Sequence, residues 1–333
     1  MKKLHIVLWI VIASLFVGGA VIGFVGFAMA DFQPQKLDGG AYEAKSYTAT
    51  TKPSAVKELL IDVPQQDISI FPTDSKEIVI DYTENQEQPF RISEQNGRLE
   101  ITQEKTGNWY DQFFNFRFQK DELMIQLPKE FIGTITATSS NGNIYVSDLS
   151  SLQYLECHAS NGEIMLENLF KINGISCETS NAQIWLQNVA SKKDITLKTS
   201  NGLIRLDEIS ATGAVQGKTS NAMVYMNQSN AEDCELITSN GTLSLDHCSV
   251  KNTINAKTSN ALLTLYQVEG KDITLKSSNG EITGGLIGNM EEYQIESHTS
   301  NGSNSLPEQK NTGTKFLRAE TSNANIEIGF TEK

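Results

Sequence analysis

The chain is poor in cysteine and histidine, and it has no excess of positive charge. Its 333 residues include four Cys and four His, and no Cys-x-x-Cys pair occurs. This composition excludes a disulfide-stapled scaffold and a cysteine-paired metal site. Lys and Arg number 27 against 40 Asp and Glu, which gives a net charge of −13. Because a surface of this sign repels phosphate backbones, nucleic acid is not an expected partner.

The sequence also lacks the short motifs of common enzymes. No Gly-x-Ser-x-Gly, His-Glu-x-x-His or phosphate-binding glycine loop is present. We therefore expect no catalytic residues, no metal and no cofactor. A polysaccharide-active β-helix enzyme is a remote alternative, because such folds can carry acidic and basic residues along an outer groove.

Apolar residues fill positions 4–30 almost without interruption, directly after Lys2 and Lys3. At about 1.5 Å per residue, a helix of this length spans roughly 40 Å, more than the ~30 Å hydrocarbon layer of a membrane. We expect one transmembrane anchor over residues 1–30, with a cytoplasmic N-terminus and an extracytoplasmic remainder. A signal peptide cleaved at Ala28-Met29-Ala30 is the alternative, and it would release a secreted protein.

A short phrase, Ser-Asn followed by Gly or Ala, recurs at ten near-regularly spaced places over residues 131–333. The steps between successive asparagines are 20, 20, 20, 20, 19, 20, 19, 22 and 22 residues. A fixed period of this size is typical of stacked supersecondary units. The asparagines are Asn141, Asn161, Asn181, Asn201, Asn221, Asn240, Asn260, Asn279, Asn301 and Asn323.

Between these asparagines, apolar residues stand at alternate positions. Ile144 and Val146 follow Asn141 by three and five places, Ile135 precedes it by six, and the other repeats largely keep this pattern. Alternation predicts half-buried strands, and one such unit buries its apolar side only by stacking on the next. Equivalent strands must then run parallel. The sequence predicts an all-β fold, a single-stranded parallel β-helix or β-solenoid with coils of about 20 residues.

Each repeated asparagine is expected at a sharp corner between two strands. Asn tolerates the left-handed backbone region better than most residues, so we expect it to adopt positive φ there. Its side-chain amides, stacked in register, predict a hydrogen-bonded ladder along the rod. The following Gly or Ala indicates a site that accepts only a small residue.

The exported part divides into three segments. Residues 31–56 predict a tether, because they are rich in Lys, Thr, Ala and Gly. Residues 57–130 contain irregular strand-like runs and predict an N-terminal β cap over the open end of the solenoid, which occupies residues 131–333. The aromatic run at 109–118 predicts either a lid on that core or a contact with the membrane interface.

These features resemble a known bacterial family. A membrane segment is followed by "LLIDVPQQDISIFPTDSKEIVIDY", by "LMIQLP" and then by serial "TSNG-x-I-x-L" coils. The order is similar to that of the adhesin-type β-strand-repeat family, domain-of-unknown-function family 4097, which includes LiaG-type envelope proteins. The resemblance covers residues 57–333. It implies a cell-envelope β-solenoid, and it supplies no catalytic residues.

The residues four places after the first five repeated asparagines form a candidate binding stripe. In a parallel stack these outward positions lie about 4.8 Å apart, and Leu203 and Met223 would widen the stripe. Aromatic and cationic side chains in such a strip suit sugar rings or an apolar patch of a partner. The alternative is that they only stabilise cross-strand stacking. The residues are Tyr145, Met165, Trp185, Arg205 and Tyr225.

Two further sets occupy matching positions of successive coils. A lysine row three places before the asparagines could meet anionic wall polymers or lipid headgroups, or could simply be a solvated face. Cys157 and Cys177 fall at one core position, where they predict small buried hydrophobes or a strained disulfide. The lysines are Lys198, Lys218, Lys257 and Lys276.

The sequence thus favours a non-catalytic cell-envelope surface protein. We expect an adhesin that binds a wall polymer, a glycan or a surface protein through an outward face of the solenoid. The alternative is an envelope-stress or sensor-accessory scaffold that docks a membrane protein through Gly19 and Gly23 or through an exposed C-terminal coil ending near Ile328.

Overall fold

A computed structural model describes residues 18–19, 23–25, 28, 43–84, 88–103 and 122–331. The predicted anchor, residues 1–30, lies outside the described residues except for the six positions within 18–28, and so does the aromatic run at 109–118. Among the residues that are described, no helix combines the length and the apolar character that crossing a membrane requires.

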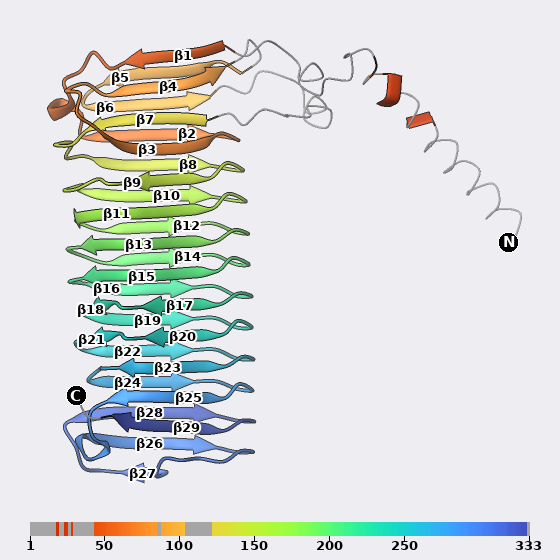
Figure 1. The fold of residues 1–333 in the computed structure, drawn as a ribbon, viewed down its shortest axis with the longest axis vertical. Helices are drawn as coiled ribbons and strands as arrows, with labels where there is room; N and C mark the ends of the chain where they lie inside the picture. Colours follow the sequence, from red (N-terminus) through yellow and green to blue (C-terminus); the bar gives the residue numbers. More distant parts are fainter. Residues whose placement is uncertain are drawn as a thin grey trace, which may run out of the picture.

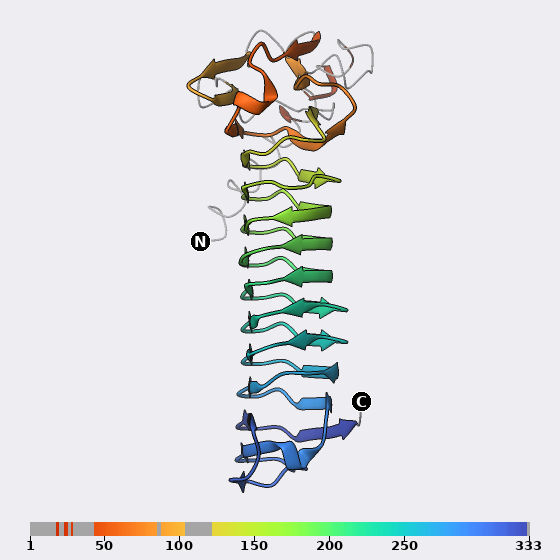
Figure 2. The ribbon, with the colours of Figure 1, turned by 90° about the vertical axis from the view of Figure 1, so that its left-hand side faces the viewer.

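The described chain is a rod of stacked coils, and the predicted all-β parallel solenoid is confirmed (Figure 1). Each regular coil contributes one strand to each of two long sheets, here called sheet A and sheet B. Strands of neighbouring coils pair in parallel, as Ile164 with Ile184 in sheet A and Leu155 with Ile175 in sheet B. Figure 2 shows the coils stacked edge-on below a broader N-terminal end.

The strands alternate between the sheets along the regular part of the chain. Sheet A contains β1 (Glu43–Thr48), β3 (Asp67–Thr73), β4 (Val79–Glu84), β7 (Glu122–Pro128), β9 (Ile144–Ser147), β11 (Ile164–Ile172), β13 (Ile184–Ser191), β15 (Ile204–Ala211), β17 (Val224–Asn227), β18 (Asn230–Ala231), β20 (Leu243–Asp246), β21 (Ser249–Val250), β23 (Leu263–Val268), β25 (Ile282–Ile287) and β29 (Ile326–Thr331). Sheet B contains β2 (Glu58–Val63), β5 (Phe90–Gln95), β6 (Arg98–Gln103), β8 (Thr134–Ser139), β10 (Tyr154–Ala159), β12 (Ile175–Glu178), β14 (Ile195–Lys198), β16 (Ala214–Lys218), β19 (Asp233–Ile237), β22 (Thr253–Lys257), β24 (Asp272–Lys276), β26 (Tyr293–Thr299), β27 (Gln309–Lys310) and β28 (Lys315–Thr321). Two 3-10 turns, η2 (Pro53–Ala55) and η3 (Met290–Glu292), complete the described elements.

The core runs along the rod between the two sheets. Alternate side chains of each strand point inward, so Ile144 and Val146 of sheet A and Ile135 of sheet B are 0% exposed. The intervening side chains point outward to solvent. This alternation places every second residue of a strand on an outer face, at the same height as its equivalents one coil away.

In the repeated coils, the corner after the sheet B strand carries the repeated asparagine, and we call it the Asn corner. The prediction of positive φ at these asparagines is wrong, because none of the ten has it. In seven coils a left-handed residue lies instead seven places after the asparagine, at the second corner of the coil, within or directly after the sheet A strand. They differ in type from coil to coil: Asp148, Asn168, Asn188, Glu208, Gln228, His247 and Gln267.

A close approach between coils, rather than backbone strain, limits the residue after the asparagine. A Cβ atom added to Gly202 would lie 1.6 Å from the carbonyl oxygen of Ala182 in the preceding coil. The buried Thr199 hydroxyl donates to that same oxygen at 3.2 Å and accepts from the Gly202 N–H at 3.1 Å. The Asn corner is thus a tight stack of backbone, and only small residues fit there.

The N-terminal end is an irregular cap made of strands β1–β7. β2 and β3 continue the parallel stack beyond β8 and β9. Farther out, β4 pairs antiparallel with β7 in sheet A, and β5 pairs antiparallel with β6 in sheet B. The segment 31–56, which the sequence assigns to a tether, contains an ordered strand, because β1 pairs antiparallel with β4. The Tyr47 hydroxyl fixes β1 further by donating to Glu94 at 2.6 Å.

At the other end, the order of the strands in space differs from their order in the chain. β28 lies between β24 and β26, so the later coil is inserted inside the earlier one. The edge of β29 is covered by residues 303–306, where Ser305 accepts from the Ile328 N–H at 3.0 Å. Leu306 is buried over this end. The C-terminal strand is therefore not a bare half-coil.

Candidate functional site

The five stripe residues lie in one continuous row on the outer face of sheet A. They come from β9, β11, β13, β15 and β17, and each is the direct register partner of the next. All are half-buried except Arg205, which is exposed. We call Tyr145, Met165, Trp185, Arg205 and Tyr225 the ladder.

Arg205 is held between two aromatic rings at the centre of the ladder. Its guanidinium carbon lies 5.4 Å from the ring centre of Trp185 and 5.9 Å from that of Tyr225. Both distances are within the range of cation–π attraction. The side chain is therefore fixed on both sides before any partner arrives.

Asp207 completes this arrangement from a position two residues along the same strand. Its Oδ2 atom accepts from Arg205 Nε at 2.5 Å and from Trp185 Nε1 at 3.2 Å. Asp207 is itself buried. The hydrogen bond to Asp207 raises the pKa of Arg205, so the guanidinium stays charged at any ordinary pH.

Carboxylates also hold the two tyrosines of the ladder. The Tyr145 hydroxyl donates to Glu167 Oε2 at 3.1 Å, and Asp246 lies near the hydroxyl of Tyr225. Burial and then the nearby carboxylate raise the pKa of Tyr225, so the phenol stays protonated. The sequence analysis did not predict that Glu167, Asp207 and Asp246 would hold the ladder. Their position two places after the stripe could have indicated it, because residues two places apart on a strand share a face.

Apolar side chains border the ladder on the side of the Asn corner. Leu203 is half-buried, and Met223 and Leu262 expose 42% and 36% of their surfaces. They stand two places after their asparagines, as the sequence predicted for Leu203 and Met223. The outer face of sheet A therefore combines aromatic, cationic and apolar groups over several coils.

The lysine row lies on the opposite side of the rod, on the outer face of sheet B. Lys218 pairs with Glu235 at 2.6 Å and Lys276 with Glu320 at 2.7 Å. Ile237 interrupts the register between Lys218 and Lys257. Lys198 and Lys218 are direct neighbours, as are Lys257 and Lys276, but Ile237 separates the two pairs, so the lysines do not form a continuous cationic strip. The row lies on a different sheet from the ladder.

The repeated asparagines form a column of side-chain hydrogen bonds along the Asn corner. The Nδ2 atoms of all these asparagines except Asn141 donate to Oδ1 of the neighbouring coil, at distances of 2.7–2.9 Å. All ten asparagines are exposed. Because each amide is already paired along the column, its first role is to hold neighbouring coils in register.

The four cysteines are buried free thiols. Cys157 and Cys177 are register partners in sheet B, without a bridge between them. Burial raises the pKa of Cys177 well above its ordinary value and that of Cys248 to about 11, which leaves them as unreactive core residues. Within the described ranges, no group of three or more His, Cys, Asp or Glu residues is arranged to hold a metal.

Comparison with known proteins identifies one family and several similar structures. The family model "Toastrack DUF4097" matches residues 56–328. No curated protein matches the chain.

The similar structures are distant. A "putative adhesin" from Parabacteroides distasonis is 10% identical, with a TM-score of 0.48 over 87% of this chain and 98% of its own. One from Bacteroides fragilis is 10% identical, with a TM-score of 0.44 over 87% and 97%. A "putative lipid binding protein" from Parabacteroides distasonis is 12% identical, with a TM-score of 0.44 over 88% and 98%. Similarities of this size do not indicate what the present chain binds.

Proposed function

The chain belongs to the Toastrack DUF4097 family, and we propose that it is a non-catalytic envelope protein that binds a wall polymer, a glycan or a surface protein through the outer face of sheet A. The observation that carries this proposal is the stack of Trp185, Arg205 and Tyr225. Trp, Tyr and Arg are the residues that most often dominate binding energy at protein interfaces.

The stack is well suited to binding because its side chains are already ordered. Asp207 and the two aromatic rings restrict Arg205, so the Arg205 side chain would lose little further conformational entropy when a ligand binds. Five ladder positions at about 4.8 Å per coil give a strip roughly 20 Å long. A strip of this length favours an extended ligand that contacts several coils.

We place the protein at the cell membrane, with the rod outside the cell. The apolar run at 4–30 supports an N-terminal anchor, and cleavage at Ala28-Met29-Ala30 would instead make the protein secreted. The polar groups of the ladder are paired with neighbouring carboxylates, as Tyr145 is with Glu167 and Arg205 with Asp207, which favours a role in contact rather than in a chemical step.

Sedimentation with insoluble wall material tests the proposal. The full chain, in a detergent without a sugar headgroup, is compared with Trp185→Ala/Tyr225→Ala and with the control Ser244→Ala/Thr264→Ala. Ser244 and Thr264 continue the same outward column, so the control changes the same face without touching the aromatic rings. We expect the ladder variant to bind about tenfold more weakly or worse, and the control to bind like the wild type. Equal binding by the ladder variant and the wild type contradicts the proposal.

A further inference from the structure

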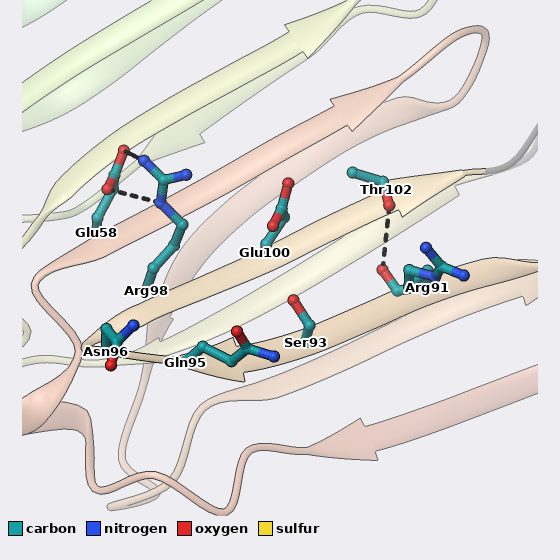
Figure 3. A pocket seen from close by; sticks show the side chains of 8 residues that line it. All are labelled: Glu58, Arg91, Ser93, Gln95, Asn96, Arg98, Glu100 and Thr102. Carbon is teal, nitrogen blue, oxygen red and sulfur yellow. Dashed lines mark hydrogen bonds and ion pairs between the residues drawn. The ribbon is translucent and has the colours of Figure 1, made fainter.

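A second concave surface lies in the cap, on the outer face of sheet B. It is a pocket of about 820 Å³, within the size range of small-molecule sites (Figure 3). Because the ladder lies on the outer face of sheet A, the two surfaces belong to different faces of the molecule. The pocket is lined by Glu58, Arg91, Ser93, Gln95, Asn96, Arg98, Glu100 and Thr102.

The pairing of β2, β6 and β5 places these side chains side by side. Arg98 is the register partner of Glu58 on one side and of Gln95 on the other, and Ser93 faces Glu100. The alternate residues of β6 point the opposite way and are 0% exposed. Among the described residues, the side chains that line the pocket are all polar.

The charges in the pocket cancel. Two arginines stand against two glutamates, and Arg98 binds Glu58 through Nε at 2.9 Å and Nη2 at 3.1 Å. An ion of either sign would meet a like charge as well as an opposite one. The lining therefore favours a neutral ligand over a phosphate or an ammonium group.

Several polar groups of the lining are still available to a ligand. Within the described ranges, the side chains of Ser93, Gln95, Asn96 and Glu100 make no hydrogen bond to the protein, and Figure 3 shows them along two neighbouring strands and the turn that joins these strands. Amides both donate and accept, a hydroxyl does the same, and a carboxylate only accepts. This mixture matches hydroxyl groups, each of which donates once and accepts.

We propose that this pocket binds a neutral saccharide unit. A sugar presents many hydroxyls and no net charge, and the polar character of the described lining residues disfavours an apolar ligand. The proposal is independent of the ladder, because it concerns other strands, another sheet and another class of contact.

Calorimetric titration of the full chain tests the pocket, again in a detergent without a sugar headgroup. The probes are maltotetraose and chitotetraose, with tetragalacturonate as the charged comparison. The pocket variant is Gln95→Ala/Glu100→Ala. The control, Lys76→Ala/Glu77→Ala, changes exposed residues of the same cap outside the pocket lining.

We expect at least one neutral tetrasaccharide to bind the wild type and the control, and to bind the pocket variant at least tenfold more weakly. Trp185→Ala/Tyr225→Ala should bind the tetrasaccharide like the wild type. No binding of either neutral probe, tighter binding of tetragalacturonate, or unchanged binding by the pocket variant would each overturn the proposal. Sedimentation with wall material reports on the ladder separately, so either proposal can fail alone.

Discussion

At the scale of single residues, Asp207 is the side chain on which the ladder depends. It is buried, and its carboxylate accepts from both Trp185 and Arg205. Without a negative charge at this position, the guanidinium would lose its fixed orientation between the rings. The ladder is therefore a supported structure rather than a row of independent surface residues.

Asp207→Asn should lower the free energy of unfolding by about 1–3 kcal/mol, because three donors, on Trp185, Arg205 and Asn227, lose a charged acceptor. Glu167→Gln is the matched comparison, since Glu167 accepts from Tyr145 alone among the ladder residues. Denaturant unfolding followed by circular dichroism gives both values. Equal stabilities for the two variants would show that Asp207 has no special role.

Glu94 has a similar role in the cap. It accepts from the backbone N–H of Thr50 at 2.8 Å and of Thr51 at 2.6 Å, besides the Tyr47 hydroxyl. Burial alone would raise the pKa of Glu94, but the hydrogen bonds from Thr51, Tyr47 and Thr50 outweigh it and lower the pKa to about 2. The carboxylate thus fastens the segment after β1 to β5.

This shift predicts a pH dependence with a defined sign. Above the ordinary value of 4.5 the stabilisation by Glu94 is fully present, and it is lost as pH falls from there to about 2, because the unfolded chain takes up the proton first. We expect Glu94→Gln to melt below the wild type at neutral pH and the gap to narrow as the medium approaches pH 2. A gap that stays constant across this range would contradict the assignment.

The strained residues could not be predicted from the sequence. The sequence predicts positive φ at Asn201, but the residue with positive φ in this coil is Glu208, with φ of 56°. Equivalent positions carry Asp, Asn, Gln and His, so no residue type marks the corner. The repeated asparagine at the Asn corner contributes its side-chain amide, which reaches the next coil, and its backbone does not adopt positive φ.

At the scale of elements, the Asn corner depends on the close approach of successive backbones. Gly and Ala occupy the same position in different coils. The glycine coils leave no room for a side chain there, since a Cβ atom at Gly202 would overlap the carbonyl oxygen of Ala182. The two residue types are therefore not interchangeable, although both are small.

Gly202→Ala should cost about 1–3 kcal/mol of unfolding free energy, because two backbones must separate. The reciprocal change, Ala182→Gly, should cost only about 0.5–1 kcal/mol, which is the usual entropic effect of glycine. Thermal melts of the two variants decide the point. If Gly202→Ala is as stable as Ala182→Gly, the close approach does not control the corner.

The repeat and its alternation were enough to predict the strands and their parallel stacking. Ile144, Ile164 and Ile184 mark three successive strands by the same spacing from their asparagines. The ends were less predictable. β26 and β28 have the same apolar pattern, so nothing local tells which of them lies outermost.

At the scale of the whole molecule, the rod separates its surfaces by sheet. The ladder lies on sheet A, whereas the lysine row and the cap pocket lie on sheet B. The sequence predicted the alignment of the ladder, because a parallel stack repeats the same outward position in each coil. It could not predict the pocket, which arises where irregular cap strands meet.

The central claim is that the outer face of sheet A is the binding surface, and hydroxyl-radical footprinting of the full chain tests it most directly. Side-chain oxidation is compared for the protein free in a detergent without a sugar headgroup and for the protein bound to wall material. We predict that Trp185, Met223 and Tyr225 are protected on binding, while exposed Tyr154 of sheet B is oxidised as before. Protection of Tyr154 with unchanged oxidation of the ladder would contradict the claim.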